Sequence, residues 1–585
     1  MAFLGVHNSI TGRKWNGPSD EQHRRAEAIA QITGQKAPVA SVLGRLAISP
    51  ESVDSYLNPL IRNLLPDPTQ LKDVSKAAQR LIKAVNDKEK VVIYADYDVD
   101  GATSGAMLVS WFRFFNIQPS IYVPDRIKEG YGPNERAMTS LSSKHDLIIC
   151  VDCGTLGHEP LEFVSEGCEV VILDHHLGSE LDPKCYSIVN PNRQIESGKL
   201  SYLCAAGVVF LTLVECGRQI KSQNKNTPNL MEYLDLVALG TVADVAPLIG
   251  VNRAFVRQGL KILSTRQRLG LQMLIDKSGL NSTPTSYHLG YILGPKLNAP
   301  GRIGPSDLAI KLLCSNSISE ATNLCEEIEE LNLKRKEIEN NVREEALEKV
   351  DKNQAKNSII WAAAEGWHPG VVGIVASRLK DKFNKPALVI GFDGIEGKGS
   401  GRSVDGYDLG FAIQRLQREG LIQKGGGHKM AAGLSLKKDQ LQTAMHRLCE
   451  LAEKDKIITP EAQEVPVDGI LFIQAVNIDL IEELENCGPF GSAIREPRFA
   501  FCDVSISFSK RVGDTHLKVR FSDDNGKSMD AICFRAFEGN LGAALAEHGG
   551  KKVHLVGKLD INYWQGKKST QLILEDAAWP EQLST

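Results

Sequence analysis

The stretch VVIYADYDVDGATS, residues Val91–Ser104, decides how the chain is organised. It opens with Val91–Ile93, a short apolar run typical of a strand buried on both faces. Three carboxylates follow at alternate positions, before Gly101 breaks the extended chain: Asp96, Asp98 and Asp100. Ligands bind at the carboxyl ends of strands in open α/β sheets. Because the three acids would repel one another without a cation among them, the stretch predicts a site for Mg²⁺ or Mn²⁺. The alternative is an acidic turn that merely stays solvated.

The composition is that of an ordinary soluble globular protein. The chain has 585 residues, 42% of them hydrophobic and 24% charged, which is enough for several domains. We expect no membrane segment, because no apolar run approaches about 18 residues. We expect no signal peptide, because the N-terminal stretch has no basic segment that leads into a long apolar one. Twelve cysteines without a spacing framework favour reduced thiols in a cytoplasm. The formal net charge of −4 means that a nucleic-acid surface must be local.

Strand and helix patterns alternate from the acidic stretch to about residue 248, which predicts a mostly parallel, doubly wound sheet. A long charged segment over 319–350 predicts a connecting helix, with a coiled-coil partner as the alternative. A second α/β unit and then short, evenly spaced strands follow, and the strands suggest a small barrel of the oligonucleotide-binding type. We therefore expect five segments: an N-terminal helical or irregular segment (1–75), an α/β domain (76–315), the helix (316–355), a second α/β domain (356–460) and an all-β barrel (461–585).

Each further strand of the predicted sheet ends in residues that can bind a metal. Asp152 follows the apolar run LIICV, and Asp174, His175 and His176 follow VVIL. Asp244 comes directly after an apolar helix pattern. Acids and imidazoles gathered at adjacent strand ends would make a two-metal cluster.

A Cys-x-x-Cys pair, Cys150 and Cys153, has the spacing of a zinc or redox motif. No second pair of cysteines or histidines lies near it, and residues three apart in a strand point to opposite faces. We interpret both thiols as small core residues.

The motifs ADYDVDGATS, VDCG and DHH, followed by Asp244, resemble in order those of the DHH phosphoesterase superfamily. Further segments resemble the RecJ family, the bacterial single-strand-specific 5′→3′ DNA exonucleases: VPDRIKEGYGPN, LGPKLNAPGRIG, EGWHPGVVGIVASRL, GSGRS and GGGHKMAAG. The likeness covers nearly the whole chain. It implies a DHH domain, a long helix, a DHHA1 domain and an OB fold, in the order inferred above. Ala95 departs from the family, in which many relatives carry Gly before the first Asp.

The resemblance implies a set of metal ligands for two divalent ions, Mn²⁺ or Mg²⁺: Asp96, Asp98, Asp100, Asp152, His175 and Asp244. Asp152 is the candidate to bridge the two ions. Asp174 is expected to orient an imidazole, as is common for metal-bound histidine. His176 is expected to face the scissile phosphate and to act in catalysis with Asp174.

Substrate phosphates are expected to bind basic and glycine-rich segments. Arg302 lies in a glycine-bracketed turn, and Arg126 lies in VPDRIKEGYG. Two glycine-rich loops are predicted to bring backbone N–H groups close to phosphate oxygens. They contain Ser400, Arg402, Gly425, Gly426, Gly427 and His428.

The resemblance implies a single-stranded-DNA-specific 5′→3′ exonuclease that releases 5′-mononucleotides and acts in DNA recombination and repair. It also implies the single-strand-binding protein and a RecQ-type helicase as partners of a monomeric, cytoplasmic enzyme. A phosphoesterase for short oligoribonucleotides or cyclic dinucleotides is the second interpretation, although those relatives are shorter and lack the barrel. A non-catalytic DNA-binding scaffold is the third, and it would require the loss of a metal ligand, whereas every acid and both histidines are present.

Overall fold

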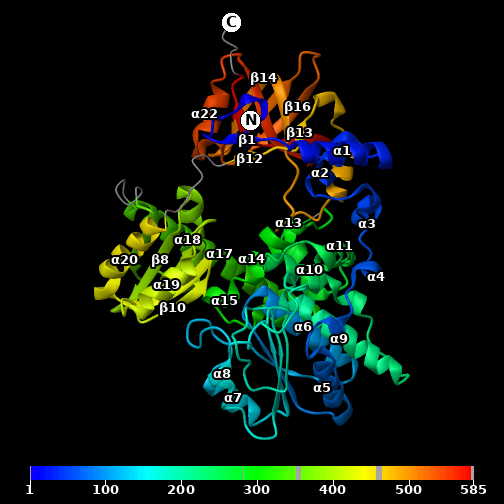
Figure 1. Ribbon diagram of the computed structural model, residues 1–585, viewed down its shortest axis with the longest axis vertical. Helices are drawn as coiled ribbons and strands as arrows, with labels where there is room; N and C mark the ends of the chain where they lie inside the picture. The colour runs from blue at the N-terminus through cyan, green and yellow to red at the C-terminus, as the bar shows by residue number, and fades with distance from the viewer. Residues whose placement is uncertain (1, 281, 351–356, 456–463, 565, 581–585) are drawn as a thin grey trace. The chain divides into compact units, whose positions relative to one another are not determined.

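The computed structural model describes residues 2–280, 282–350, 357–455, 464–564 and 566–580 (Figure 1). The chain divides into two compact units. The first unit comprises Met1–Leu65, Pro247–Ala254 and Pro460–Thr585, and the second comprises Pro66–Ala246 and Phe255–Thr459. The five-segment division expected from the sequence remains a prediction. In the described part of the chain, no helix has both the length and the apolarity to cross a bilayer.

The first sheet of the second unit is fully parallel, in the order β3-β2-β4-β5-β6. This confirms the predicted parallel sheet. The sequence pattern predicts strands at Val91–Tyr94, Ser120–Val123, Leu147–Val151 and Val170–Leu173, and a strand lies at each of them. The sequence pattern does not predict the short strand β6. The strands are β2 (Val91–Ala95), β3 (Ser120–Tyr122), β4 (Leu147–Val151), β5 (Glu169–Leu173) and β6 (Ser187–Val189).

Helices pack around this sheet because its strands are apolar on both faces. The helices before, between and after its strands are α5 (Val74–Asp87), α6 (Val99–Phe114), α7 (Glu135–Ser142), α8 (His158–Leu161) and α9 (Ala205–Ser222). A helical region follows, with η4 (Leu230–Tyr233), α10 (Leu234–Ala243), α11 (Gly250–Ser264), α12 (Leu269–Lys277), α13 (Ser286–His288), the π-helical turn η5 (Leu289–Leu293), α14 (Gly294–Leu297), α15 (Pro300–Ile303) and α16 (Leu308–Cys314).

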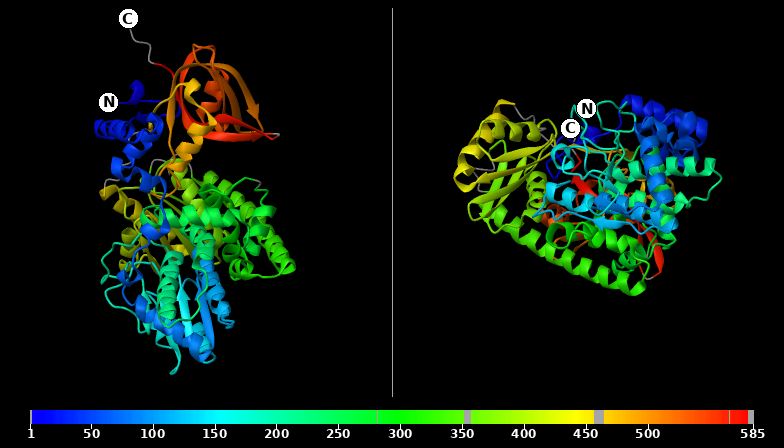
Figure 2. Two further views of the ribbon diagram at one scale, coloured as in Figure 1. Left: turned by 90° about the vertical axis from the view of Figure 1, so that its right-hand side faces the viewer. Right: turned by 90° about the horizontal axis from the view of Figure 1, so that it is seen from below.

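The predicted long helix is confirmed as α17 (Ile318–Lys349), visible from below in the right view of Figure 2. Its buried face includes Ile328 and Val342. It packs first against α12, α14, α15 and α16, and then against α18 (Pro369–Phe383). The apolar positions that could have formed a coiled coil are therefore used inside the unit.

The second sheet of this unit has the order β10-β11-β9-β8-β7. Its strands are β7 (Ile360–Glu365), β8 (Ala387–Asp393), β9 (Glu396–Arg402), β10 (Lys424–His428) and β11 (Ala431–Lys437), with α19 (Leu409–Arg418) and α20 (Leu441–Lys454). The prediction of glycine-rich loops is therefore wrong, because GSGR and KGGGH are strands. Glycine is rare in strands, but here it lets α19 pack closely on the sheet. A Cβ on Gly401 would lie 2.7 Å from Leu409 Cδ2, and one on Gly425 would lie 2.6 Å from Ile413 Cγ2.

The first unit contains the predicted barrel, seen in the left view of Figure 2. Its strands are β13 (Gly469–Ile470), β14 (Phe499–Val512), β15 (His516–Ser522), β16 (Ser528–Cys533), β17 (Lys552–Trp564) and β18 (Lys567–Ala578). Pairing of β14 with β17 closes it. The segment AICFRAF, residues 531–537, has a strand pattern throughout, but β16 ends within it at Cys533. Arg535 takes a left-handed backbone (φ 55°) and starts the turn η9 (Ala536–Glu538), which α22 (Asn540–Ala546) follows.

Residues from both ends of the chain share the core of this unit. From the N-terminal side, α1 (Asp20–Thr33) and α2 (Ala37–Arg45) supply Ile29 and Leu43 to the cluster that holds Phe501 and Phe521. The short strand β1 (Lys14–Asn16) pairs in parallel with β12 (Glu464–Pro466). The remaining elements are η1 (Phe3–Gly5), η2 (Pro50–Ser52), α3 (Val53–Leu57), α4 (Ile61–Leu64), η8 (Ile473–Ala475) and α21 (Ile478–Asn486) here, and η3 (Pro68–Gln70) and η7 (Lys438–Gln440) in the second unit.

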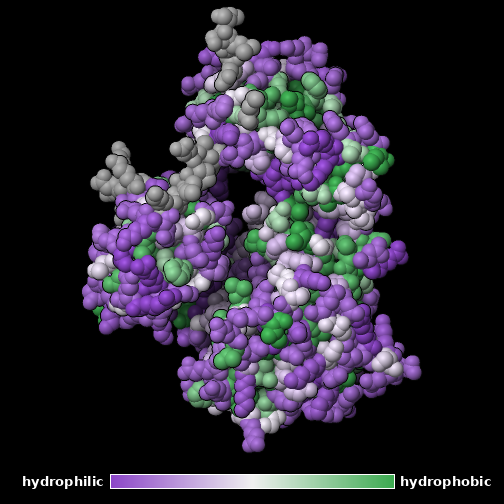
Figure 3. Space-filling view, viewed as in Figure 1, coloured by the Kyte–Doolittle hydropathy of each residue, from purple (hydrophilic) through white to green (hydrophobic). Residues whose placement is uncertain are grey.

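The surface drawn in Figure 3 is mostly hydrophilic, with apolar residues in small groups. Such scattering is normal for globular proteins.

A buried carboxylate fastens the N-terminal segment to the barrel. Asp576 has no exposed surface, and its two oxygens accept hydrogen bonds from Thr11 Oγ1 and Trp15 Nε1, both at 2.9 Å. The backbone N–H of Ile10 also donates to the carbonyl of Ala577 at 2.8 Å. Since buried polar groups need partners, Asp576 ties the stability of the barrel to its N-terminal extension.

Replacing Asp576 with Ala leaves the Trp15 indole N–H and the Thr11 hydroxyl without their buried acceptor. We expect Asp576→Ala to lower the free energy of unfolding by about 1–3 kcal/mol. Urea unfolding followed by circular dichroism measures the change. Asp524→Ala is the control, because that carboxylate is 76% exposed beside Lys552. Equal urea midpoints for the two variants would contradict the assignment.

Candidate metal centre

The turn between β2 and α6 presents the acidic triplet. Asp98 is the N-cap of α6, and its Oδ1 accepts from the backbone N–H groups of Asp100 (2.9 Å) and Gly101 (3.2 Å). The cap draws the chain into a tight turn, which a side chain on Gly101 would block, since its Cβ would lie 2.4 Å from the carbonyl oxygen of Asp96. The same residues that start the helix therefore aim the carboxylates at the sheet edge.

A second helix start holds Asp100. Its carboxylate oxygens accept from the backbone N–H groups of Ala205 (2.6 Å) and Ala206 (2.9 Å), at the N-terminus of α9. Such amides and the helix dipole favour a negative charge. Gly240 of α10 leaves the room required, because a Cβ there would lie 2.8 Å from Asp100 Oδ1.

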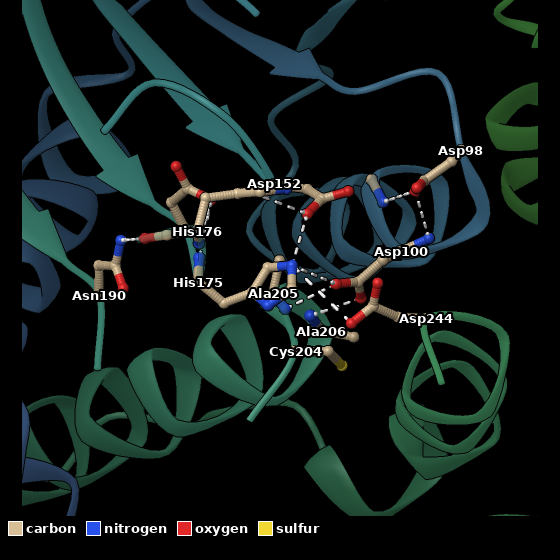
Figure 4. Close-up of polar contacts among 12 residues, drawn as sticks. Asp98, Asp100, Asp152, His175, His176, Asn190, Cys204, Ala205, Ala206 and Asp244 are labelled. Atoms are coloured by element: carbon tan, nitrogen blue, oxygen red, sulfur yellow. Dashed lines mark hydrogen bonds and ion pairs between the residues drawn. The ribbon is translucent and has the colours of Figure 1, made fainter. Parts of the chain in front are cut away.

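His175 lies at the centre of the acids, as Figure 4 shows. Its Nε2 is 3.3 Å from Asp152 Oδ1 and 3.8 Å from both Asp100 Oδ2 and Asp244 Oδ2. Asp152 comes from the end of β4, His175 from the end of β5 and Asp244 from the C-cap of α10. The structure thus brings together residues that lie far apart along the chain.

The side chains form groups with the spacing of metal ligands: Asp100–His175–Asp244, Asp96–Asp98–Asp152 and Asp152–His175–His176. All six predicted ligands belong to these groups, and Asp152 belongs to two of them. Within the described residues, the Oδ1 atoms of Asp96 and Asp152 are buried without a hydrogen-bond partner. Orphaned buried carboxylate oxygens beside an imidazole fit hard divalent cations such as Mn²⁺ or Mg²⁺.

The electrostatics of the cluster also fit a cation. Burial, and then repulsion by Asp98, raise the pKa of Asp96, and burial with several neighbouring acids raises the pKa of Asp152. Burial, and then Asp100 and Asp98, raise the pKa of Asp244 to about 8. Burial lowers the pKa of His175, which leaves the neutral ring that a metal ligand requires. Without a cation, these acids resist simultaneous ionisation.

Asp174 and His176 form a separate pair beside the cluster. Asp174 Oδ1 lies 2.8 Å from His176 Nδ1 and also accepts from the backbone N–H of His175 at 2.7 Å. Burial opposes charge on His176, but the hydrogen bond to Asp174 and its charge outweigh burial and raise the pKa of His176 to about 9. The His176 ring therefore holds a proton at neutral pH beside the metal ligands.

Two residues of the site have a strained backbone. Asp152 has φ 60° and Val245, directly after Asp244, has φ 58°. A positive φ is strongly unfavourable for the β-branched Val245 and less so for Asp152, and such residues are concentrated at functional sites. At Asp152, this conformation accompanies a carboxylate that lies 3.3 Å from His175 Nε2.

The predicted arginines gather on the same unit. Arg126 stacks over the Tyr97 ring at 5.0 Å, and Arg302 Nη1 donates to the carbonyl of Gly370 at 3.2 Å. Burial, and then repulsion by Arg126, lower the pKa values of Arg302, to about 10, and of Arg402. Arg302 lies in the short helix α15, so the prediction of a turn is wrong; Pro300 at its start favours the helix.

Ser400, Arg402 and His428 share one face of the second sheet. Strand register pairs Gly433 with Ser400 and Gly426, and Ala431 with Arg402 and His428. A Cβ on Gly426 would meet nothing within 4 Å, whereas Cβ atoms on Gly425 and Gly427 would clash with α19 or with strand β11. One face of the strands is therefore open beside an arginine, and the glycines on the other serve packing.

Several residues of the site escape sequence reasoning. Tyr131 donates to the carbonyl of Asp152 at 3.0 Å, and Asn190 Nδ2 donates to the carbonyl of His176 at 2.8 Å. Asn298 Oδ1 accepts from the backbone N–H of Val99 at 3.1 Å. Tyr131 and Asn298 lie inside the quoted motifs EGYGPN and GPKLNAPG, which is the signal that could have found them. Asn190 has no such signal.

A parallel α/β sheet whose edge carries an Asp/His cluster, with arginines on the same unit, defines a metal-dependent phosphoesterase of the DHH class. The family model of the DHH family, N-terminal domain, matches residues 90–241, that of the DHHA1 domain matches 356–454, and that of the RecJ OB domain matches 467–576.

Comparison with curated proteins shows which family of this class the chain belongs to. The single-stranded-DNA-specific exonuclease RecJ of Escherichia coli (strain K12) is 35% identical over 541 residues, which cover 89% of this chain and 92% of that protein. The protein of that name from Bacillus subtilis (strain 168) is 35% identical over 527 residues, covering 88% of this chain and 64% of that protein. The chain belongs to the RecJ family.

Solved structures agree with this membership. A crystal structure of RecJ in complex with Mn²⁺ from Thermus thermophilus aligns with a TM-score of 0.81 at 26% identity, covering 97% of this chain and 80% of that one. A second RecJ structure, bound to manganese, aligns with a TM-score of 0.58 at 31% identity, covering 67% of this chain and 96% of that one.

The role of the close approach of Gly240 to Asp100 can be tested by comparing Ala substitutions at Gly240 and at a control glycine. We expect Gly240→Ala to weaken Mn²⁺ binding at least about tenfold, because the new methyl displaces Asp100 Oδ1; tenfold corresponds to about 1.4 kcal/mol. Isothermal titration calorimetry measures the affinity. In Gly217→Ala, the control on α9, the Cβ meets nothing within 4 Å. The assignment fails if both variants bind Mn²⁺ as the unmodified chain does.

Proposed function

We propose that this chain is a single-stranded-DNA-specific exonuclease that hydrolyses phosphodiester bonds from the 5′ end and releases 5′-mononucleotides. The observation that carries the proposal is the cluster around His175, whose Nε2 lies within 3.8 Å of three carboxylates, in a member of the RecJ family. Membership implies a role in DNA recombination and repair.

The metal ligands of the proposed site divide into two sets that share Asp152. Asp100, His175 and Asp244 would hold one divalent ion, and Asp96 and Asp98 would hold the other. When bound, such ions lower the pKa of a water molecule and neutralise phosphate oxygens. The amides of α9 favour the charged form of Asp100 but do not outweigh burial, which raises the pKa of this carboxyl, and a bound cation would favour the charged form further. The neutral ring of His175 offers its lone pair.

His176 is the proposed proton donor. Its ring is held by Asp174 and touched by Tyr131 Oη, 2.9 Å from Nδ1. The charged ring can donate from Nε2 to a non-bridging phosphate oxygen or to the departing 3′-oxygen. Asp174 acts through His176 by fixing the orientation of the ring and stabilising its charge.

Arg126, Arg302 and Arg402, with Ser400, are proposed to bind the phosphates of the 5′-terminal nucleotides. An anion relieves the mutual repulsion of these guanidinium groups, and their planar forks match phosphate oxygens. His428 and the open strand at Gly426 extend this face. Gly425 and Gly427 support the same face through their packing.

The expected partners follow from family resemblance alone: the single-strand-binding protein and a RecQ-type helicase. We also propose that the chain works as a monomer in the cytoplasm. Its twelve cysteines are all free thiols, which suits a reducing compartment. Sedimentation of the chain alone and with single-strand-binding protein tests the monomer and the first partner.

Polarity and metal dependence can be measured together on single-stranded DNA labelled at the 5′ or the 3′ end. We expect immediate release of labelled mononucleotide from the 5′ label alone, with Mn²⁺ or Mg²⁺, and none with chelator. Release from the 3′ label first would refute the polarity. Intact long DNA alongside cleaved dinucleotides would instead favour the phosphoesterase for short substrates.

The ligand assignment can be tested without removing the helix cap. We expect Asp98→Asn combined with Asp152→Asn to reduce nuclease activity by at least about 10³-fold, since both proposed ion sites lose a charged ligand and the charge of the phosphate is no longer neutralised. Asparagine remains an N-cap, so the fold is kept.

The controls for this variant are its circular dichroism spectrum and its affinity for oligothymidylate, both of which should match those of the unmodified chain. Asp146→Asn, at the opposite end of β4, should retain activity. Nuclease activity that persisted in the double variant would show that the site lies elsewhere.

A further inference from the structure

Two tyrosines outside the predicted site form an exposed aromatic stack in the second unit. Tyr287 and Tyr291 lie four residues apart, and their rings are 5.1 Å apart at an interplanar angle of 28°. Tyr291 is 74% exposed and Tyr287 is 56% exposed. Core packing does not explain rings that face water to this extent, because burial is what offsets the ordering of aromatic side chains.

The helical turns around this pair have three distinct faces. Leu289 and Leu293 are fully buried and anchor the segment. Gly290 and Gly294 face α10: Cβ atoms built on them would lie 3.4 Å from Val242 Cγ1 and from Ala243 Cβ, respectively. The tyrosines occupy the remaining face. Glycines at the contact let the segment approach α10 closely, directly before the metal ligand Asp244.

The same segment continues into the catalytic machinery. Asn298 accepts from the backbone N–H of Val99 in the metal-binding turn. A Cβ on Gly301 would lie 2.6 Å from the carbonyl oxygen of Tyr97, and Arg302 follows directly. The tyrosine pair therefore belongs to a continuous stretch of chain that borders the metal centre. The π-helical turn η5 within it is a rare conformation that often occurs at functional sites.

We propose that Tyr287 and Tyr291 form a stacking platform for unpaired nucleobases of the strand held at the metal centre. This inference rests on the proposed function. Aromatic faces bind bases of any sequence, and each stacked base contributes about 1–3 kcal/mol. Bases in a duplex are already stacked on their neighbours and paired, so the platform accepts only a single strand. The preference for single-stranded over duplex DNA then arises from binding of the strand on this part of the fold and not from the cleavage reaction.

The test compares binding of a 20-residue oligothymidylate with that of the same oligonucleotide made abasic beyond its two 5′-terminal residues. Chelator is present so that neither strand is cut, and fluorescence anisotropy reports the dissociation constant. The variants are Tyr287→Ala with Tyr291→Ala, the matching double Phe variant, and Phe163→Ala. Phe163, 41% exposed after α8, is the control aromatic.

We expect the double Ala variant to bind oligothymidylate about tenfold or more weakly than the unmodified chain, and the double Phe and Phe163 variants to bind normally. The unmodified chain should also discriminate against the abasic strand about tenfold more strongly than the double Ala variant does. A purely structural role would weaken binding of both strands equally and would overturn the platform.

Unchanged binding of oligothymidylate by the double Ala variant would also overturn it. Nuclease activity of the unmodified chain separates the two claims. If that chain fails to cut single-stranded DNA with Mn²⁺, the proposed function fails; if it cuts while the Ala variant discriminates normally, the platform alone fails.

Discussion

Mutual repulsion among buried carboxylates is the constraint on which the second unit depends. Asp96, Asp100 and Asp152 are 4%, 1% and 2% exposed, and Asp244 completes the group. Burying like charges is costly unless opposite charge or oriented dipoles compensate. The chain compensates with the cap at Asp98, the N-terminal amides of α9 and the ring of His175, and cations fit the remaining orphaned oxygens.

The metal centre also requires that backbone segments approach one another closely. Gly101, Gly240 and Gly301 each lie where a side chain would collide with the metal-binding turn or with one of its carboxylates. At the start of α18, Gly370 lies where a Cβ would be 2.1 Å from the carbonyl oxygen of Arg302. These glycines share one purpose: each lets an element that carries a functional side chain come within reach of another.

The sequence predicts much of this site because its residues follow local rules. Alternating acids after a buried strand, and a histidine pair after another, point to one sheet edge whatever the details of packing. The amides of Ala205 and Ala206, and the tyrosine stack, carry no such local rule, since they depend on which elements meet in space. The glycine-rich strands are predicted as loops for a related reason, because glycine by itself disfavours strands. Only the side chains of Leu409 and Ile413 on the facing helix show why glycine is required at these positions.

The hydrogen bond from Val99 to Asn298 joins the metal-binding turn to the stretch that carries Arg302 and the tyrosines. In the proposed function, ions bind at the turn and a DNA strand binds along the stretch. When two ligands stabilise the same bond, their affinities are linked, and each strengthens the other by the same factor. If both ligands stabilise the hydrogen bond between Val99 and Asn298, the ions are held most firmly when a strand is bound at the site.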